Sequence, residues 1–357
     1  MKMRQSGGAL ALPLLLAAHA VPAHADHSDD HIIAIGQKAD EHGPAGMMGE
    51  HIHRGGEIMV GVSWMHDSYS GTNRSGTGKI ADMAIAEAGF TARTKRMTMD
   101  MVMLHLMWAP SDRITFAVMP SWMRMEMTML GVGMPMDGEH GATATDHHTL
   151  APGETMTHSV SGIGDTEVGA LVSLSRNPSF TAHAGLAVSI PTGSVTRRNA
   201  NGTFVHYGMQ PGSGTWDVIP SLTLGGGNEN WRWGAQARYR HRAEDRNKSG
   251  FRFGHRFDSS VWLTRPLSPA AALTVRLAYR DEGAIKGHYN GAHGHTAPPD
   301  RQANYGGQLL EAGLGGNLIA AGKWRLGAEA TLPLHQDVNG IQAPKRFGAS
   351  MNLSRMF

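Results

Sequence analysis

The sequence predicts an all-β protein, a 12-stranded antiparallel transmembrane β-barrel with short periplasmic turns and long extracellular loops. Three observations predict this fold class. The chain begins with an export signal, it contains many segments in which apolar and polar residues alternate, and the connections between these segments are short and long in turn. These features are typical of barrels in the bacterial outer membrane, which is where we expect the protein to be located.

The export signal occupies residues 1–25. Lys2 and Arg4 precede the apolar stretch "ALALPLLLAA", and Ala23-His24-Ala25 has the small-x-small pattern of a cleavage site. The apolar stretch is too short to anchor the chain in a membrane. We therefore expect a signal peptide over 1–25, a His-rich periplasmic N-terminal tail over 26–55, and the barrel over 56–357.

The composition narrows the class of protein and its partners. The chain has 46 glycines, no cysteine and no later run of 18 apolar residues, so neither disulfides nor a transmembrane helix is expected. Without Lys2 and Arg4, its 32 basic residues become 30, against 30 acidic residues. This balance argues against a nucleic-acid partner and leaves outer-membrane lipid as the expected one.

Twelve segments show the alternation, each bounded by turn residues. They cover 56–66, 97–108, 113–127, 163–175, 179–190, 215–225, 231–242, 252–264, 270–281, 307–319, 323–335 and 346–357. Connections after even-numbered segments are short, as in "APSD" and "PLSP". Those after odd-numbered segments are longer, at 67–96, 128–162, 191–214, 243–251, 282–306 and 336–345. A soluble β-sandwich would alternate too, but it would not explain this asymmetry. Since charges are costly in hydrocarbon, the polar face of each segment should line the lumen.

Methionines dominate one face of the first three segments. The residues concerned are Met59, Met65, Met97, Met99, Met101, Met103, His105, Met107, Met119, Met123, Met125, Met127 and Met129. Of 23 methionines in the chain, 17 lie between Met47 and Met136, so the concentration is local. The opposite faces carry aliphatic residues and tryptophan, which suit lipid better. We therefore expect the methionines and His105 to point into the lumen as one continuous wall.

The methionine-lined lumen has three alternative explanations, two of which name a cargo. Thioethers favour Cu(I) or Ag(I), and imidazole also suits copper, so a ladder of weak ligands could pass a soft metal ion along. A thioether wall could equally line a path for small apolar or aromatic compounds, or serve as flexible apolar filler. Histidines gather near both mouths, which favours the metal hypothesis: His27, His31, His42, His51, His53, His140, His147, His148, His158, His288, His293 and His295.

No catalytic motif accompanies these features. The sequence has no G-x-S-x-G elbow, no Walker loop, no H-E-x-x-H and no paired cysteines. We therefore expect a non-enzyme that requires no cofactor, with Cu(I) or Ag(I) only as possible cargo.

Several stretches resemble outer-membrane transporter-like proteins grouped with the phenol-degradation meta-pathway family, in a Met/His-rich branch. They are "GPAGMMGEHIHRGGEIMVGVSWMHDSYSG", "TKRMTMDMVMLHLMWAPSDRITFAVMPSW", "SGIGDTEVGALVSL", "LAVSIPTGS" and "YGMQPGSGTWDVIPSLT", from residue 43 to about residue 223. The resemblance implies an outer-membrane β-barrel with a transport role and leaves the cargo open.

Overall fold

The computed structural model describes residues 38–133, 150–177, 179–320 and 324–357. The predicted signal peptide and the histidines His27, His31, His140, His147 and His148 lie outside the described residues. Within the described ranges, no helix is both long enough and apolar enough to cross a membrane.

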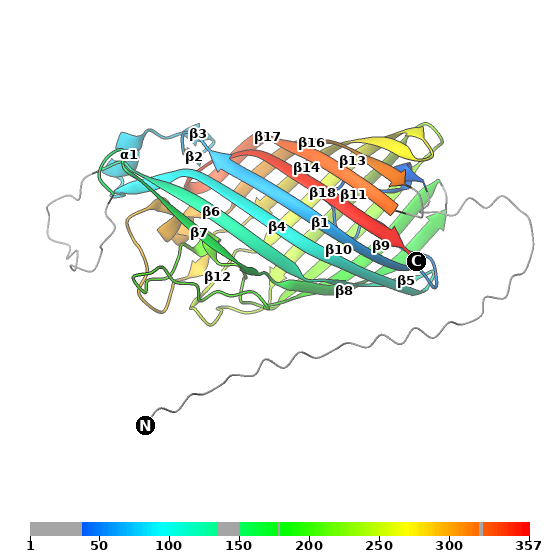
Figure 1. Ribbon diagram of the computed structural model, residues 1–357, viewed down its shortest axis with the longest axis horizontal. Helices are drawn as coiled ribbons and strands as arrows, with labels where there is room; N and C mark the ends of the chain where they lie inside the picture. Colours follow the sequence, from blue (N-terminus) through cyan, green and yellow to red (C-terminus); the bar gives the residue numbers. More distant parts are fainter. Residues whose placement is uncertain (1–37, 134–149, 178, 321–323) are drawn as a thin grey trace, which may run out of the picture. The chain divides into compact units, whose positions relative to one another are not determined.

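Twelve antiparallel crossings form the wall, as the sequence predicts (Figure 1). In chain order they are β1 (Ile58–Ser70), β4 (Ala92–Ser111), β5 with β6 (Ile114–Met119, Ser121–Gly131), β7 with β8 (Thr155–Ile163, Thr166–Asn177), β9 (Phe180–Ile190), β10 (Asp217–Gly227), β11 (Arg232–Arg242), β13 (Arg256–Ser268), β14 (Ala271–Glu282), β16 (Gly307–Ala320), β17 (Trp324–Gln342) and β18 (Lys345–Met356). The sheet closes because β1 pairs with both β4 and β18. Closure pairs the backbone groups that lipid could not satisfy.

Two crossings are interrupted at neighbouring points of the wall. Pro120 separates β5 from β6, since proline has no N–H to donate to a strand ladder. Residues 164 and 165 separate β7 from β8, and the N–H of Gly164 donates to the carbonyl of Ser121 at 2.9 Å. A Cβ atom on Gly164 would lie 2.4 Å from the Ser121 hydroxyl, so this close approach requires glycine.

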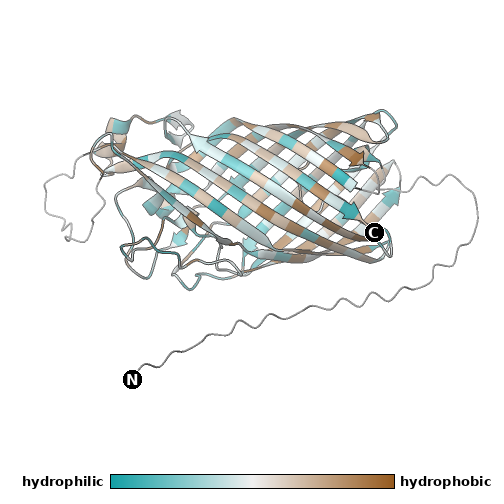
Figure 2. Ribbon diagram, viewed as in Figure 1, coloured by the Kyte–Doolittle hydropathy of each residue, from teal (hydrophilic) through white to brown (hydrophobic). Residues whose placement is uncertain are grey.

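The two faces of the wall differ as the alternation predicts (Figure 2). In β1, the side chains of Ile58, Val60 and Val62 are 38–47% exposed, whereas Met59 and Ser63 are buried. The same alternation of exposed apolar and buried residues recurs around the barrel. The exposed set is the lipid-facing band, and the buried set lines the lumen.

Three strands differ from the predicted boundaries. β4 is 20 residues long, β17 runs to Gln342, and β7 lies in what the sequence predicts as loop 128–162. The predicted loop 336–345 is therefore wrong, because only residues 343 and 344 connect β17 to β18. The end of β17 is largely polar on both faces, as in "HQDVNG", and the outward face of β7 carries only threonine and serine up to residue 161, so neither has the apolar outward face that marks a membrane-spanning strand.

The long loops pack against one another at the end of the barrel opposite the C-terminus. They contain β2 (Arg74–Gly76), β3 (Gly78–Lys79), α1 (Asp82–Glu87), η2 (Tyr207–Met209), β12 (Phe251–Arg252), β15 (Lys286–Gly287), η3 (Pro298–Asp300) and η4 (Gln302–Asn304). Tyr289 lies between Phe204 and Tyr207, with ring centroids 4.2 and 4.3 Å away. This buried aromatic stack joins loops that are far apart in the sequence.

Residues 38–55, here called the plug segment, fold into the lumen at the end with the short turns. The segment begins with the short helix η1 (Ala39–Glu41). Side chains of the wall bind its backbone: Gln236 donates to the carbonyl of Met48 at 3.1 Å, and Asn317 donates to that of His42 at 3.1 Å. The described part of the predicted periplasmic tail therefore lies inside the barrel, because the polar lumen satisfies its backbone groups.

Candidate functional site

All thirteen predicted site residues lie on the lumen side of β1, β4, β5 and β6, which we call the methionine wall. Seven are buried: Met59, Met103, Met107, Met119, Met125, Met127 and Met129. Six are partly buried: Met65, Met97, Met99, Met101, Met123 and His105. The strand register explains why they form one surface, since alternating residues of three adjacent strands share a face.

Direct cross-strand pairs organise the methionine wall. The register places seven methionine pairs opposite each other: Met59–Met107, Met59–Met356, Met65–Met101, Met97–Met127, Met99–Met125, Met101–Met123 and Met129–Met156. Residues in such positions have Cβ atoms about 4.5–5.5 Å apart. Thioethers therefore adjoin one another along and across the strands, from the plug segment to the extracellular loops.

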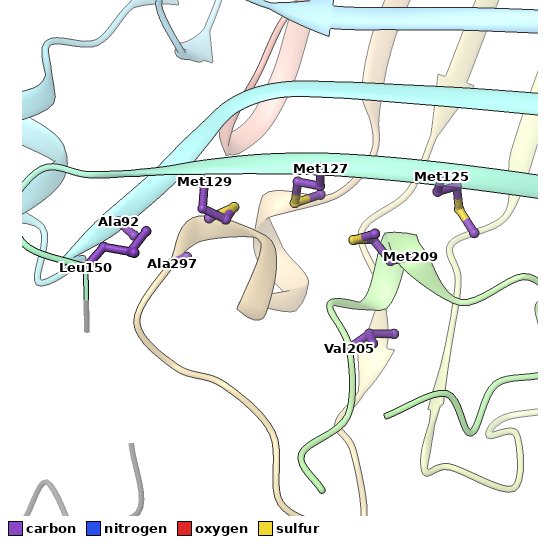
Figure 3. Close-up of a cluster of buried hydrophobic side chains, with 8 residues drawn as sticks. All are labelled: Ala92, Met125, Met127, Met129, Leu150, Val205, Met209 and Ala297. Carbon is purple, nitrogen blue, oxygen red and sulfur yellow. The ribbon is translucent and has the colours of Figure 1, made fainter. Parts of the chain in front are cut away.

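The extracellular end of the methionine wall is a packed core rather than an open lining (Figure 3). Met125, Met127 and Met129 on β6 pack with Met209 of η2 and with Val205. The Thr94 hydroxyl lies 3.8 Å from the sulfur of Met127. Sequence reasoning places these methionines on the correct face, but it does not foresee the loop that covers them.

A central cavity of about 300 Å³ lies deeper in the lumen. One side is lined by thioethers of the methionine wall, joined by two methionines of the plug segment: Met47, Met48, Met65, Met99, Met101 and Met123. The other side carries guanidinium groups, those of Arg238, Arg256, Arg276 and Arg280. A second cavity of about 270 Å³ lies under the loops and shares Met99 and Arg280 with the first. The lumen thus contains space with one apolar and one charged side.

The charged side contains a ladder of shared ion pairs. Six arginines contact four carboxylates: Arg238 and Arg240 with Glu167, Arg240 and Arg242 with Asp217, Arg256 and Arg280 with Asp258, and Arg276 with Glu329. Arg276 binds Glu329 through two parallel contacts of 2.8 Å. The arginines of this ladder outnumber its carboxylates, and two further carboxylates of the central cavity, Asp67 and Glu311, share Lys345 beside it.

The sequence matches the model of one known protein family. A family model described as "Putative MetA-pathway of phenol degradation" matches residues 127–331, which is more than half of the chain. The chain belongs to this family. No functionally curated protein matches the sequence.

Among solved structures, this family member is similar to the COG4313 outer membrane channel from Pseudomonas putida F1. The identity is 15%, the TM-score is 0.57, and the match covers 87% of this chain and 98% of the other. The P. putida toluene transporter TodX matches less well, with 11% identity, a TM-score of 0.38, and coverage of 86% and 91%. At these identities the likeness concerns the fold. The chain has the fold of an outer-membrane β-barrel.

Sequence reasoning missed two contributors to the lumen of this family member. Glu50 lies beside two histidines of the plug segment, and its carboxylate contacts Arg325 at 3.1 Å. Met209 comes from a loop and lies 80 residues after Met129, the last residue of the methionine wall. The stretch "MMGEHIH" shows the donor residues around Glu50, but no local pattern indicates that a segment preceding the first strand turns into the barrel.

A buried ion pair in the loops of this barrel should make their stability depend on pH. The Nδ1 atom of His206 lies 2.7 Å from the Asp300 carboxylate. Burial opposes protonation of His206, but Asp300 outweighs it and raises the pKa of the imidazole. The stability from this pair is therefore present from mildly acidic to neutral pH, above the lowered pKa of Asp300, is lost as pH rises through the raised pKa of His206, and amounts to about 1.5–3 kcal/mol.

Hydrogen–deuterium exchange tests this prediction. After correction for the intrinsic effect of pH, peptides covering 204–210 should exchange faster at alkaline than at neutral pH, and a His206→Gln variant should lose that difference. His293→Gln is the matched control, because its imidazole contacts a backbone carbonyl, that of Gly291, at 2.8 Å. Equal pH dependence in all three proteins would refute the prediction.

Proposed function

We propose that this outer-membrane channel passes small aromatic compounds that carry a hydroxyl or carboxylate group. The central cavity is the observation that carries the proposal. Its thioether side offers sulfur–aromatic contacts, each worth about 0.3–1.5 kcal/mol. Its arginine side offers charge-assisted hydrogen bonds to an oxygen substituent. The family description names phenol degradation, and phenol is a compound of this class.

Two variants, each with three substitutions, test whether benzoate flux requires an apolar wall. Met99, Met101 and Met123 line the central cavity and project from two adjacent strands. Replacing all three with glutamine keeps their length but removes the apolar surface, whereas leucine keeps the apolar surface and removes sulfur. We expect the glutamine triple to slow radiolabelled benzoate flux into proteoliposomes about tenfold, because it removes both the apolar surface and the sulfur–aromatic contacts. The leucine triple removes only the sulfur–aromatic contacts and should slow the flux less.

Two controls accompany this measurement. Met83→Gln makes the same chemical change on α1, where the side chain is 72% exposed, and it should leave benzoate flux unchanged. Sucrose flux reports any general widening or blockage of the pore. Wild-type benzoate flux through the folded glutamine triple would overturn the proposal.

A second candidate cargo is the soft metal ion, Cu(I) or Ag(I). The seven cross-strand methionine pairs favour it, because adjacent thioethers provide successive weak ligands along the wall. The same variants separate the two cargoes, since both triples remove sulfur. Silver flux lost equally in the leucine and glutamine triples would support the metal. Silver flux unchanged in the leucine triple would rule it out.

A further inference from the structure

The plug segment folds back on itself and brings three potential metal ligands together. A turn follows Pro44, where the N–H of Met47 donates to the Pro44 carbonyl at 3.1 Å. His42, Glu50 and His51 each then offer one ligand atom, and these atoms all lie within 4.8 Å of one another. The rings of His42 and His51 meet edge to face, with centroids 5.0 Å apart. Residues eight and nine positions apart in the sequence thus form one cluster.

The cluster is held inside the barrel rather than on its surface. The His42 residue is 4% exposed, and the side chains of Glu50 and His51 are 5% and 17% exposed. One Glu50 oxygen contacts Arg325 of β17, and the other contacts the Nδ1 atom of His51. His53 packs edge to face on His51, with centroids 4.7 Å apart. The donor groups are therefore fixed in place before any ligand arrives.

A small cavity adjoins the cluster and supplies a second, independent observation. Its volume is about 30 Å³, which is about the volume of one water molecule and enough for one metal ion. Glu50, His51 and His105 line it, together with the thioethers of Met47, Met59 and Met107. The Nε2 atoms of His51 and His105 are buried, and within the part of the chain that the structure describes neither has a hydrogen-bond partner.

From these residues we infer that the plug segment holds a copper(II) ion, with His42, Glu50 and His51 as its ligands and His105 of the barrel wall as a further donor. Calcium and magnesium prefer sets of oxygen ligands, which this cluster lacks. Imidazole with carboxylate suits first-row transition metals, among which copper(II) binds most strongly to a given site. The ion links the plug segment to β4, and this role does not depend on which solute the channel passes.

Copper binding to the full-length protein in detergent tests the inference. Electron paramagnetic resonance with added copper(II) sulfate should detect a tight site with imidazole nitrogen ligands. That signal should be lost in the His42→Gln/His51→Gln double variant. His335→Gln is the matched control, because His335 is exposed on β17 outside the cluster, and it should retain the signal. Retention of the tight site by a folded double variant would overturn the assignment.

A second measurement uses the unaltered chain and does not rely on the variants folding. Copper(II) should slow hydrogen–deuterium exchange in peptides covering residues 42–53, because the ion ties both ends of this turn together. Copper bound to histidines elsewhere in the chain would leave those peptides unaffected. Unchanged exchange in 42–53 at saturating copper would overturn the inference, whatever solute the channel carries.

Discussion

Replacing Glu329 with alanine should loosen the plug segment and increase the conductance of the channel. The Glu329 carboxylate accepts two hydrogen bonds from Arg276 and one from the backbone N–H of Gly46, at 3.2 Å. Its side chain is 1% exposed. Removing one partner of a buried ion pair costs about 3–5 kcal/mol, because the other charge remains buried and uncompensated. The same change removes a direct link between the plug segment and β17.

Planar-bilayer recordings and heat-dependent gel mobility measure the two effects of Glu329→Ala. We expect larger and more variable single-channel currents, together with a lower unfolding temperature. Glu329→Gln should give an intermediate result, since the amide oxygen can still accept from Gly46. Glu126→Ala is the matched control, because the Arg124–Glu126 pair is exposed and 3.9 Å apart, so its loss should cost less than about 1 kcal/mol. Currents and stability like those of the wild type in Glu329→Ala would contradict the role given to this carboxylate.

An arginine on the lipid face should destabilise the barrel by an amount that depends on depth. Leu277 lies near the middle of β14 and is 47% exposed. Leu277→Arg should cost about 2–4 kcal/mol, because the charge must leave water for hydrocarbon. Leu267→Arg makes the same change beside the short turn between β13 and β14, where the cost should be about 0–1 kcal/mol.

Urea titration of folding in lipid vesicles measures both of these free energies. A large difference between Leu277→Arg and Leu267→Arg would confirm that β14 spans the membrane with Leu277 outward. Equal effects of the two substitutions would mean that the exposed apolar band is not the lipid-facing surface.

The sequence predicts the wall of this channel well because alternation is a local signal. A strand with one face in lipid and one in the lumen must alternate, so Val60 and Met59 separate cleanly by residue type alone. The same logic places His105 and the methionines on the inner face. It fails for β7 and for the end of β17, because their outward residues are polar and do not mark a lipid-facing strand.

The contents of the lumen depend on contacts between distant residues, which the sequence does not display. Gly46 meets Glu329, and Gln236 meets Met48, across separations of 283 and 188 residues. Nothing in the local pattern of the plug segment distinguishes a free tail from a segment bound inside a barrel. The packing of Met209 on the methionine wall is hidden for the same reason.

The plug segment is covalently continuous with β1, so a plug segment displaced from the lumen would remain tethered beside it. A short flexible connection keeps a displaced segment at an effective local concentration in the millimolar range. Re-entry is then a unimolecular step whose rate is independent of how much protein the membrane contains. A separate peptide copying residues 38–55 would have to reach comparable concentrations before it could compete for the same contacts.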